Sequence, residues 1–210
     1  MATLTDPLAS AIAELEDEKV LTLVQERLQD GVVPMEIVRS LQEGMTEVGH
    51  RFETGEYFLS ELIMCGESMK EAMVELEPHL VGVNQEHRGS IVVGTVKGDV
   101  HDLGKNIVVM LLKGAGYNVI DLGVDVSAAK FIDAITENNA PLVGMSVLLT
   151  GCQEGMKDII TAVRAAGLGV KIVIGGNYVD ETVRNYVGAD YYGSIASDAV
   201  KIAEQVFAAK

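Results

Sequence analysis

The feature that most limits the fold of this chain is the alternation of short apolar runs with helical patterns after residue 88. Each run is rich in β-branched residues and bounded by glycine or polar residues, which is typical of strands buried in a parallel sheet. The runs are 91–96, 117–122, 142–147, 170–174 and a weak one at 190–192. Apolar residues at helical spacing predict helices over 104–113, 128–138, 154–166, 178–187 and 197–208. This alternation predicts an α/β fold with a flavodoxin-like (Rossmann-like) five-stranded parallel sheet of order 2-1-3-4-5.

The chain before residue 85 has a different pattern, in which apolar residues recur at helical spacing only. Asp6-Pro7 is typical of a helix N-cap followed by proline at the first helical position, and Asp30-Gly31 of a helix end. Further helices are expected from Pro34 to about Phe52 and from Leu59 to about Leu76, with Pro78 closing or kinking the last one. Residues 1 to about 83 therefore predict an antiparallel bundle of four short helices, in which the first segment is long enough to form two helices or one continuous helix.

A polar connection at 81–88 predicts a helical bundle domain at 1–85 and an α/β domain at 89–210.

Composition and charge narrow the range of possible functions. No apolar stretch is long enough to span a bilayer and residues 1–6 lack a signal-peptide pattern, so we expect a cytoplasmic protein that does not bind membranes. The net charge of -15 disfavours nucleic-acid binding and is typical either of solvated helical faces or of a surface that attracts basic partners. Cys65 and Cys152 lack the spacing of a disulfide framework or a cysteine metal site, so two reduced thiols are expected.

The loop after the first expected strand carries the residues with the most chemistry. It reads Lys97-Gly98-Asp99-Val100-His101-Asp102-Leu103-Gly104. In open α/β sheets, ligands bind at the carboxyl ends of the strands, where this loop would lie. A carboxylate two residues before an imidazole can accept one ring N–H and so fix the tautomer of a metal-binding histidine. From the tripeptide 99–101 alone, an ordinary surface histidine is the more frequent case.

The expected strand order brings two other loops to the same edge of the sheet. The loop after the third strand runs from Ser146 to Cys152 and contains small and hydroxyl residues, and the loop after the fourth is Gly175-Gly176-Asn177. These residues leave room for a large flat ligand to approach the backbone, although a plain tight turn explains the glycine pair equally well.

Together, these elements resemble the cobalamin-binding domain of corrinoid proteins. The resemblance is carried by Asp99-x-His101-x-x-Gly104, then Ser146-x-Leu148, then Gly175-Gly176. The stretch 48–59, Val-Gly-His-Arg-Phe-Glu-Thr-Gly-Glu-Tyr-Phe-Leu, is similar to the helical cap of the same family. The resemblance covers nearly the whole chain, which looks like a stand-alone methyl-carrying corrinoid protein of a methyltransferase system. It is similar also to the cobalamin module of methionine synthase.

The resemblance implies that His101 binds the cobalt ion in place of the cofactor's own dimethylbenzimidazole base. Asp99 would be the hydrogen-bond partner of His101. Gly104 would let the nucleotide tail of the cofactor pass into the protein, and Gly175 and Gly176 would accommodate that tail.

Other positions are assigned by the same resemblance. Ser146, Leu148 and Thr150 would line the displaced base, while Phe52 and Leu59 would cover the upper, methyl-bearing face; without the resemblance, ordinary helix core explains these two residues better. The full set of expected cofactor-binding residues is Gly98, Asp99, Val100, His101, Asp102, Leu103, Gly104, Ser146, Leu148, Thr150, Gly175, Gly176, Phe52 and Leu59.

Two positions depart from the family pattern. Cys152 stands where relatives commonly have a hydroxyl residue that extends the hydrogen-bond chain from His101 through Asp99, and a thiol is a weaker hydrogen-bonding group. The chain of hydrogen bonds therefore ends at Asp99, or continues through water or Cys152. Ser60 replaces a commonly seen proline, which leaves the start of the helix near Leu59 open.

The function implied by the resemblance is methyl transfer on cobalamin, with methylcobalamin as the loaded form. The expected partners are a substrate-specific corrinoid methyltransferase of O-demethylase or methylamine type, a second methyltransferase acting on tetrahydrofolate or coenzyme M, and a reductive activator. Acids and bases that could demethylate a substrate are not apparent, so the chain is not expected to be catalytic alone.

Three other functions compete with methyl transfer. A cobalamin-dependent sensor or regulatory module would need an output domain, and no basic helix-turn-helix is expected here. A radical mutase subunit is disfavoured by the cap bundle. A receiver domain is disfavoured because Ser146 stands where a phosphoacceptor aspartate would end the third strand.

Overall fold

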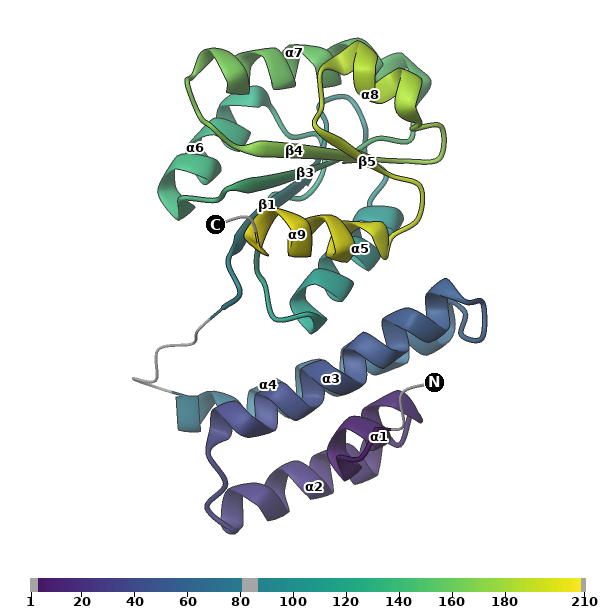
Figure 1. The fold of residues 1–210 in the computed structure, drawn as a ribbon, viewed down its shortest axis with the longest axis vertical. Coiled ribbons are helices and arrows are strands. Elements are labelled where there is room, and N and C mark those ends of the chain that lie inside the picture. Colours follow the sequence, from purple (N-terminus) through teal and green to yellow (C-terminus); the bar gives the residue numbers. More distant parts are fainter. Residues whose placement is uncertain (1–3, 81–86, 209–210) are drawn as a thin grey trace. The chain divides into compact units, whose positions relative to one another are not determined.

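The computed structural model describes residues 4–80 and 87–208, which form a helical unit followed by an α/β unit (Figure 1). The connection expected at 81–88 lies, for its residues 81–86, outside the described residues. No helix among the described residues has the length and apolarity needed to cross a membrane.

Among its described residues, the helical unit contains four helices, so the first segment forms two helices rather than one. They are α1 (Pro7–Ala13), α2 (Asp17–Gln29), α3 (Pro34–Glu53) and α4 (Leu59–Leu80). Asp6 caps α1 because its carboxylate accepts the backbone N–H groups of Leu8 at 2.7 Å and Ala9 at 3.2 Å. Leu15, between α1 and α2, has φ of 62°, a left-handed conformation that separates the two helices. Pro78 does not close α4, which continues to Leu80.

The α/β unit contains a five-stranded sheet in which every strand pair is parallel. Its strands are β1 (Ser90–Thr95), β2 (Asn118–Asp121), β3 (Leu142–Ser146), β4 (Lys171–Gly175) and β5 (Tyr191–Gly193). Their order is β2-β1-β3-β4-β5, which confirms the expected topology. The switch point therefore lies between β1 and β3, where neighbouring loops diverge and a ligand can enter.

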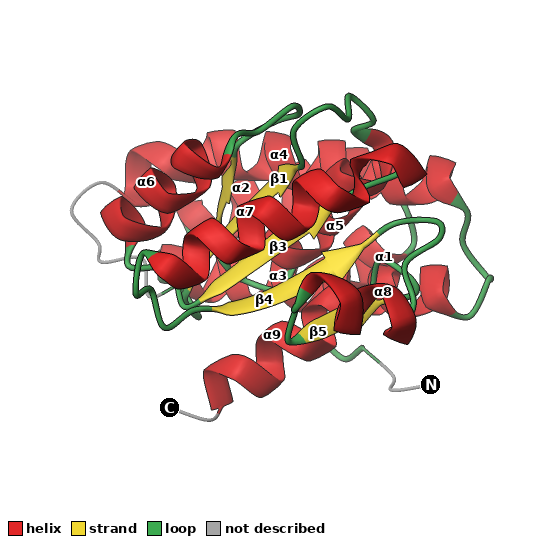
Figure 2. Ribbon diagram, turned by 90° about the horizontal axis from the view of Figure 1, so that it is seen from above, coloured by secondary structure: helices red, strands yellow, loops and turns green. Residues whose placement is uncertain are grey.

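The helices of this unit are α5 (Leu103–Gly114), α6 (Ala128–Asn138), α7 (Gln153–Ala165), α8 (Glu181–Val187) and α9 (Asp198–Ala208). Figures 1 and 2 show α6, α7 and α8 on one face of the sheet and α5 and α9 on the other. The first face is closed by a continuous apolar core that includes Phe131, Met156 and Ile160. A short 3-10 helix, η1 (Thr150–Cys152), precedes α7 and was not expected from the sequence.

Candidate functional site

The loop between β1 and α5 lies at the carboxyl end of β1 and is held by its neighbours. Gly98 has φ of 87°, which favours glycine, and its N–H donates to Asp125 Oδ1 at 2.8 Å. The N–H of Asp125 donates to the carbonyl of Asp99 at 3.0 Å. The buried hydroxyl of Thr95 donates to the carbonyl of His101 at 3.0 Å. These bonds fix the loop from both sides, and Thr95 and Asp125 were not identified from the sequence.

Asp99 is fully buried and accepts four hydrogen bonds. Its Oδ1 accepts the backbone N–H of His101 at 3.0 Å and contacts His101 Nδ1 at 2.7 Å. Its Oδ2 accepts the N–H groups of Leu148 at 2.6 Å and Leu149 at 2.9 Å. Burial alone would raise the pKa of Asp99, but the three backbone N–H groups and the imidazole hold this pKa well below its usual range. The carboxylate is therefore ionised and can only accept.

The ionised carboxylate determines which nitrogen of His101 is available to a ligand. Because Asp99 can only accept, Nδ1 carries the proton, and in the neutral ring Nε2 then has the free lone pair. The His101 side chain is 47% exposed and lines a cavity. This is the geometry in which a carboxylate orients a histidine for binding to a metal ion.

The hydrogen-bond chain from His101 ends on backbone amides. The N–H groups of Leu148 and Leu149 both donate to the second oxygen of Asp99. Cys152 lies close to the loop between β1 and α5, since the Sγ of Cys152 would be 3.4 Å from a Cβ added at Gly98. The sequence could not reveal these amide bonds, since they depend on how the chain turns after β3.

A cavity of about 620 Å³ extends from His101 between the sheet and the helices α5 and α9. It exists because small residues occupy one face of neighbouring strands: Ser146 pairs with Gly175, and Gly175 pairs with Gly193. Its lining residues are Val93, Val100, His101, Asp102, Leu103, Gly104, Lys105, Val108, Gly144, Met145, Ser146, Val147, Leu148, Val173, Ile174, Gly175, Gly176, Asn177, Gly193, Ser194, Ile195, Ala196 and Ala199. Exposed apolar side chains of Val100, Leu103 and Leu148 belong to this lining and suit a large apolar ligand.

Two family descriptions match the chain, and both read B12 binding domain. One matches residues 89–201 and the other residues 4–77. The chain belongs to the B12-binding family of corrinoid proteins. Its cofactor is a corrinoid of the cobalamin type.

Relatives agree with this assignment over nearly the full length of the corrinoid protein. Dimethylamine corrinoid protein 2 of Methanosarcina acetivorans is 36% identical over 211 residues, which cover 99% of this chain and 97% of the relative. A cobalamin-binding protein from Desulfitobacterium hafniense has a TM-score of 0.77 and 37% identity, covering 94% of this chain and 96% of its own. The methanol:cobalamin methyltransferase complex MtaBC from Methanosarcina barkeri contains a chain with a TM-score of 0.89 and 30% identity, covering 100% of this chain and 81% of its own.

The residues of the corrinoid protein fit such a cofactor. A Cβ added at Gly104 would meet nothing within 4 Å, so this glycine borders open space in the cavity. Most residues expected at the site do line the cavity, namely Val100, His101, Asp102, Leu103, Gly104, Ser146, Leu148, Gly175 and Gly176. Of the others, Asp99 contacts Nδ1 of His101, and Gly98 anchors the loop through its bond to Asp125.

Besides Gly98 and Asp99, three further expected residues do not line the cavity. Thr150 is exposed in η1, because the chain turns into this short helix directly after Leu149. Phe52 and Leu59 belong to the helical unit, where both are half-buried. Their role toward the cofactor stays a prediction.

Gly176 has a structural reason to be glycine. Its φ is 155°, and an added Cβ would lie 1.8 Å from the carbonyl oxygen of Val147. The glycine is therefore required for two backbone segments to approach each other, whether or not a ligand is bound.

Several lining residues were missed in the sequence, among them Gly144, Val173, Gly193 and Ala199. A signal for Gly144 was present, because an isolated glycine inside an apolar strand often marks a place where another group comes close to the backbone. The positions of Val173 and Ala199 depend on the register of β4 and the packing of α9, which no local pattern indicates.

Proposed function

We propose that this corrinoid protein carries a methyl group on the cobalt ion of cobalamin between two methyltransferases. The first removes the methyl group from a methylamine, and the second passes it to tetrahydrofolate or coenzyme M. The methylamine class is supported by the relatives named dimethylamine corrinoid proteins, at 36% to 38% identity. A reductive activator of the corrinoid completes the proposed set of partners.

The observation that carries this proposal is the pairing of His101 with the buried, ionised Asp99. Asp99 holds the Nδ1 proton of His101 and leaves Nε2 to bind the cobalt ion in place of the cofactor's own base. Gly104 and the open space beside it would accommodate the displaced nucleotide tail. Bound cobalamin supplies the metal that accepts and donates the methyl group, chemistry that protein side chains do not provide.

The proposed task of the protein residues is therefore to bind the cofactor, to orient it and to tune the strength of the histidine ligand. A hydrogen bond from Nδ1 to a carboxylate raises the basicity of the other ring nitrogen, so Asp99 strengthens His101 as a ligand. The apolar side chains of Val100, Leu103 and Leu148 limit the access of water to the bound cofactor. The described residues offer no observation that favours the alternative, a cobalamin-dependent sensor.

We also propose that the helical unit covers the methyl-bearing face through Phe52 and Leu59. Support comes from the position of these residues at the end of α3 and the start of α4, in the stretch 48–59 that resembles the family's cap. Both side chains are half-buried within the unit and so retain apolar surface that can meet a ligand.

Replacing His101 with alanine tests the ligand assignment directly. We expect His101→Ala to stay folded and to change the visible spectrum of the cobalamin-bound protein, because the nitrogen ligand is lost. His79→Ala, at an exposed histidine of α4 outside the stretch 48–59, is the matched control and should leave the spectrum unchanged. An identical spectrum for both variants and the wild type would overturn the assignment.

The carrier role is tested by methylating the reduced, cobalamin-bound protein. With a purified dimethylamine-type methyltransferase and dimethylamine, the spectrum should convert to that of the methylated form. Conversion with a methanol or methoxyarene system, and none with methylamine systems, would contradict the proposed donor.

A further inference from the structure

Thr95 ends β1 and is held in place by backbone hydrogen bonds. Its N–H donates to the carbonyl of Gly123 at 3.0 Å, and its own carbonyl accepts the N–H of Val126 at 3.0 Å. The N–H of the next residue, Val96, donates to the carbonyl of Ser146 at 3.0 Å, on the other side of β1. Thr95 is fully buried and therefore occupies a fixed place between the ends of β2 and β3.

The side chain of Thr95 points to the face of the sheet that borders the cavity. Side chains alternate between the two faces of a strand, and Val93, two residues earlier, lines the cavity. A β-branched side chain has few rotamers, so the direction of the Thr95 hydroxyl is restricted. This hydroxyl donates to the carbonyl of His101 at 3.0 Å, across the loop between β1 and α5.

The bond from Thr95 completes the hydrogen bonds that fix His101. The N–H of His101 donates to Asp99 Oδ1 at 3.0 Å, and its Nδ1 contacts the same oxygen at 2.7 Å. Its carbonyl, at the other end of the residue, accepts the hydroxyl of Thr95. Without that hydroxyl, the peptide group after His101 loses its anchor to β1 and gains freedom to rotate, which changes the direction of Nε2.

Thr95 acts on a ligand through His101, since Thr95 is not among the described residues that line the cavity. A group that is already held in its binding direction loses less conformational entropy when it binds. We propose that Thr95 is a positioning residue, whose bond to the His101 carbonyl strengthens the binding of Nε2 to the cobalt ion. The proposal rests on the function proposed above, in which His101 is the ligand of that ion.

A purely structural role for Thr95 is the competing explanation, because a buried hydroxyl needs a hydrogen-bond partner wherever it lies. The two roles differ in how they depend on the imidazole. If the role is structural, removing the hydroxyl affects cobalamin binding to the same extent whether or not position 101 is histidine. If Thr95 positions His101, the effect on binding disappears together with the imidazole. A double-mutant cycle separates the two roles.

The cycle compares the affinity for hydroxocobalamin of four full-length proteins: the wild type, Thr95→Val, His101→Ala and the double variant. Valine has nearly the shape of threonine and lacks the hydroxyl. In the wild-type background, we expect Thr95→Val to weaken binding roughly threefold to tenfold, the usual range for one hydrogen bond. In His101→Ala the same change should weaken binding less than about twofold. An equal loss in both backgrounds would overturn the proposal.

The potential of the Co(II)/Co(I) couple of the bound cobalamin is a second readout, which a loss of stability alone does not move. An axial nitrogen ligand stabilises Co(II) relative to Co(I), so weaker binding by His101 raises this potential. A loss of roughly threefold to tenfold corresponds to a rise of roughly 30 to 60 mV for one electron. We expect this rise when Thr95→Val is made in the wild type and no further rise when it is added to His101→Ala.

Two further variants control for the loss of a threonine. Thr95→Ser keeps the hydroxyl and should retain the affinity and the potential of the wild type. Thr161→Val removes a hydroxyl that also donates to a backbone carbonyl, that of Lys157 at 2.8 Å, but Thr161 is an exposed residue of α7 that does not line the cavity. It should leave both readouts unchanged. Equal changes in Thr95→Val and Thr161→Val would contradict the role of Thr95.

The outcomes distinguish a failure of this inference from a failure of the proposed function. If His101→Ala leaves the affinity and the potential at their wild-type values, His101 is not the ligand and both proposals are wrong. If His101→Ala shifts them but Thr95→Val does not, only the role of Thr95 is wrong. Thr95→Ala takes the place of Thr95→Val in the cycle if urea unfolding shows that the valine variant is not folded. If neither variant folds, the hydroxyl serves the fold and the positioning role is wrong.

Discussion

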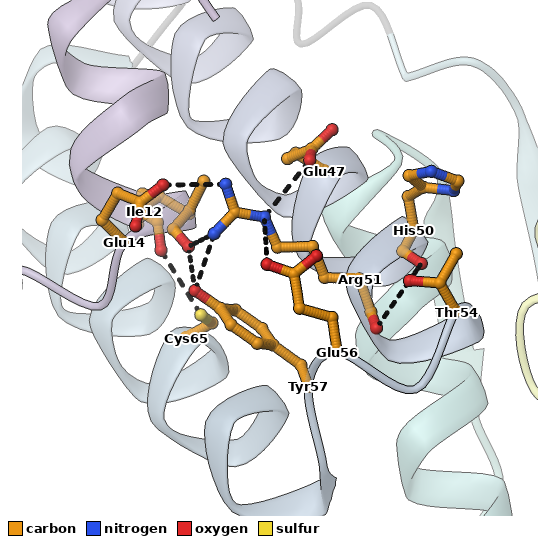
Figure 3. Close-up of polar contacts among 10 residues, drawn as sticks. Ile12, Glu14, Glu47, His50, Arg51, Thr54, Glu56, Tyr57 and Cys65 are labelled. Carbon is orange, nitrogen blue, oxygen red and sulfur yellow. Dashed lines mark hydrogen bonds and ion pairs between the residues drawn. The ribbon is translucent and has the colours of Figure 1, made fainter. Parts of the chain in front are cut away.

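Two polar clusters of this protein are built alike and differ in one respect. In the helical unit, Arg51 Nη2 donates to Glu14 at 2.7 Å, Nη1 donates to Tyr57 at 2.9 Å, and Nε donates to Glu47 at 3.2 Å (Figure 3). In the α/β unit, Asp99 accepts four N–H groups. The polar groups of the Arg51 cluster bond to one another, whereas the Asp99 cluster leaves Nε2 of His101 available to a ligand in the cavity. In this protein the functional site is marked by a ring nitrogen that is available to a ligand rather than by the number of charged residues.

The closed cluster has a clear structural task. Arg51 Nη1 and the hydroxyl of Tyr57 both donate to the carbonyl of Ala13, at 3.1 Å and 2.5 Å, where α1 ends. The Cys65 thiol donates to the neighbouring carbonyl of Ile12 at 3.4 Å. Hydrogen bonding to Glu14 raises the pKa of Arg51 above its ordinary value, although burial opposes the charge. These groups satisfy carbonyls that a helix end would otherwise leave unpaired and connect α1 to the turn between α3 and α4.

The largest effect on the free energy of unfolding is expected from Asp99→Ala. It leaves the N–H groups of Leu148 and Leu149 and the ring of His101 without their acceptor, at a cost of about 3 kcal/mol. Cobalamin binding should weaken in parallel, because the imidazole loses its orientation. Urea unfolding and cobalamin titration measure the two effects.

Asp133→Ala is the control for that loss, because Asp133 is an exposed carboxylate of α6 that does not line the cavity. It should change the free energy of unfolding by less than about 0.5 kcal/mol, as is usual for surface positions. Equal losses in the two variants would show that Asp99 has no special place in the loop.

Arg51→Met should have the second largest effect on the free energy of unfolding and should leave cobalamin binding unchanged. We expect the helical unit to lose about 2 kcal/mol, because the Ala13 carbonyl and the Glu47 carboxylate lose a charged donor. Cobalamin affinity should stay within twofold of wild type. Lys19→Met, which removes an exposed ion pair with Glu16 in the same unit, should cost less than about 0.5 kcal/mol. If Arg51→Met weakened cobalamin binding without a loss of stability, the Arg51 cluster would serve the ligand rather than the fold.

The same contrast explains what the sequence could predict. Strand order, the four helices of the first unit and the position of His101 follow from periodicity, caps and a glycine-bracketed loop, which are local signals. The bonds from Leu148 and Leu149 to Asp99, and from Arg51 to Ala13, join segments 49, 50 and 38 residues apart. Backbone N–H and carbonyl groups occur at nearly every position, so no side-chain pattern could single these ones out.

Two glycines of the site show the same difference between a position that serves the ligand and one that serves the fold. Gly104 borders open space, so we expect Gly104→Leu to change the free energy of unfolding by less than about 0.5 kcal/mol while its side chain enters the cavity and weakens cobalamin binding. The overpacking that such a change causes in a filled core has no basis at this position. Urea unfolding and cobalamin titration again separate the two effects.

Gly176→Ala should behave in the opposite way, because its Cβ would meet the carbonyl of Val147 and its φ of 155° disfavours any side chain. We expect it to destabilise the α/β unit by about 2 kcal/mol with the cofactor absent. Gly104 would then be glycine because of the ligand and Gly176 because of the fold. If Gly104→Leu destabilises the apoprotein as much as Gly176→Ala does, the space beside Gly104 is needed for folding, and its assignment to the nucleotide tail is wrong.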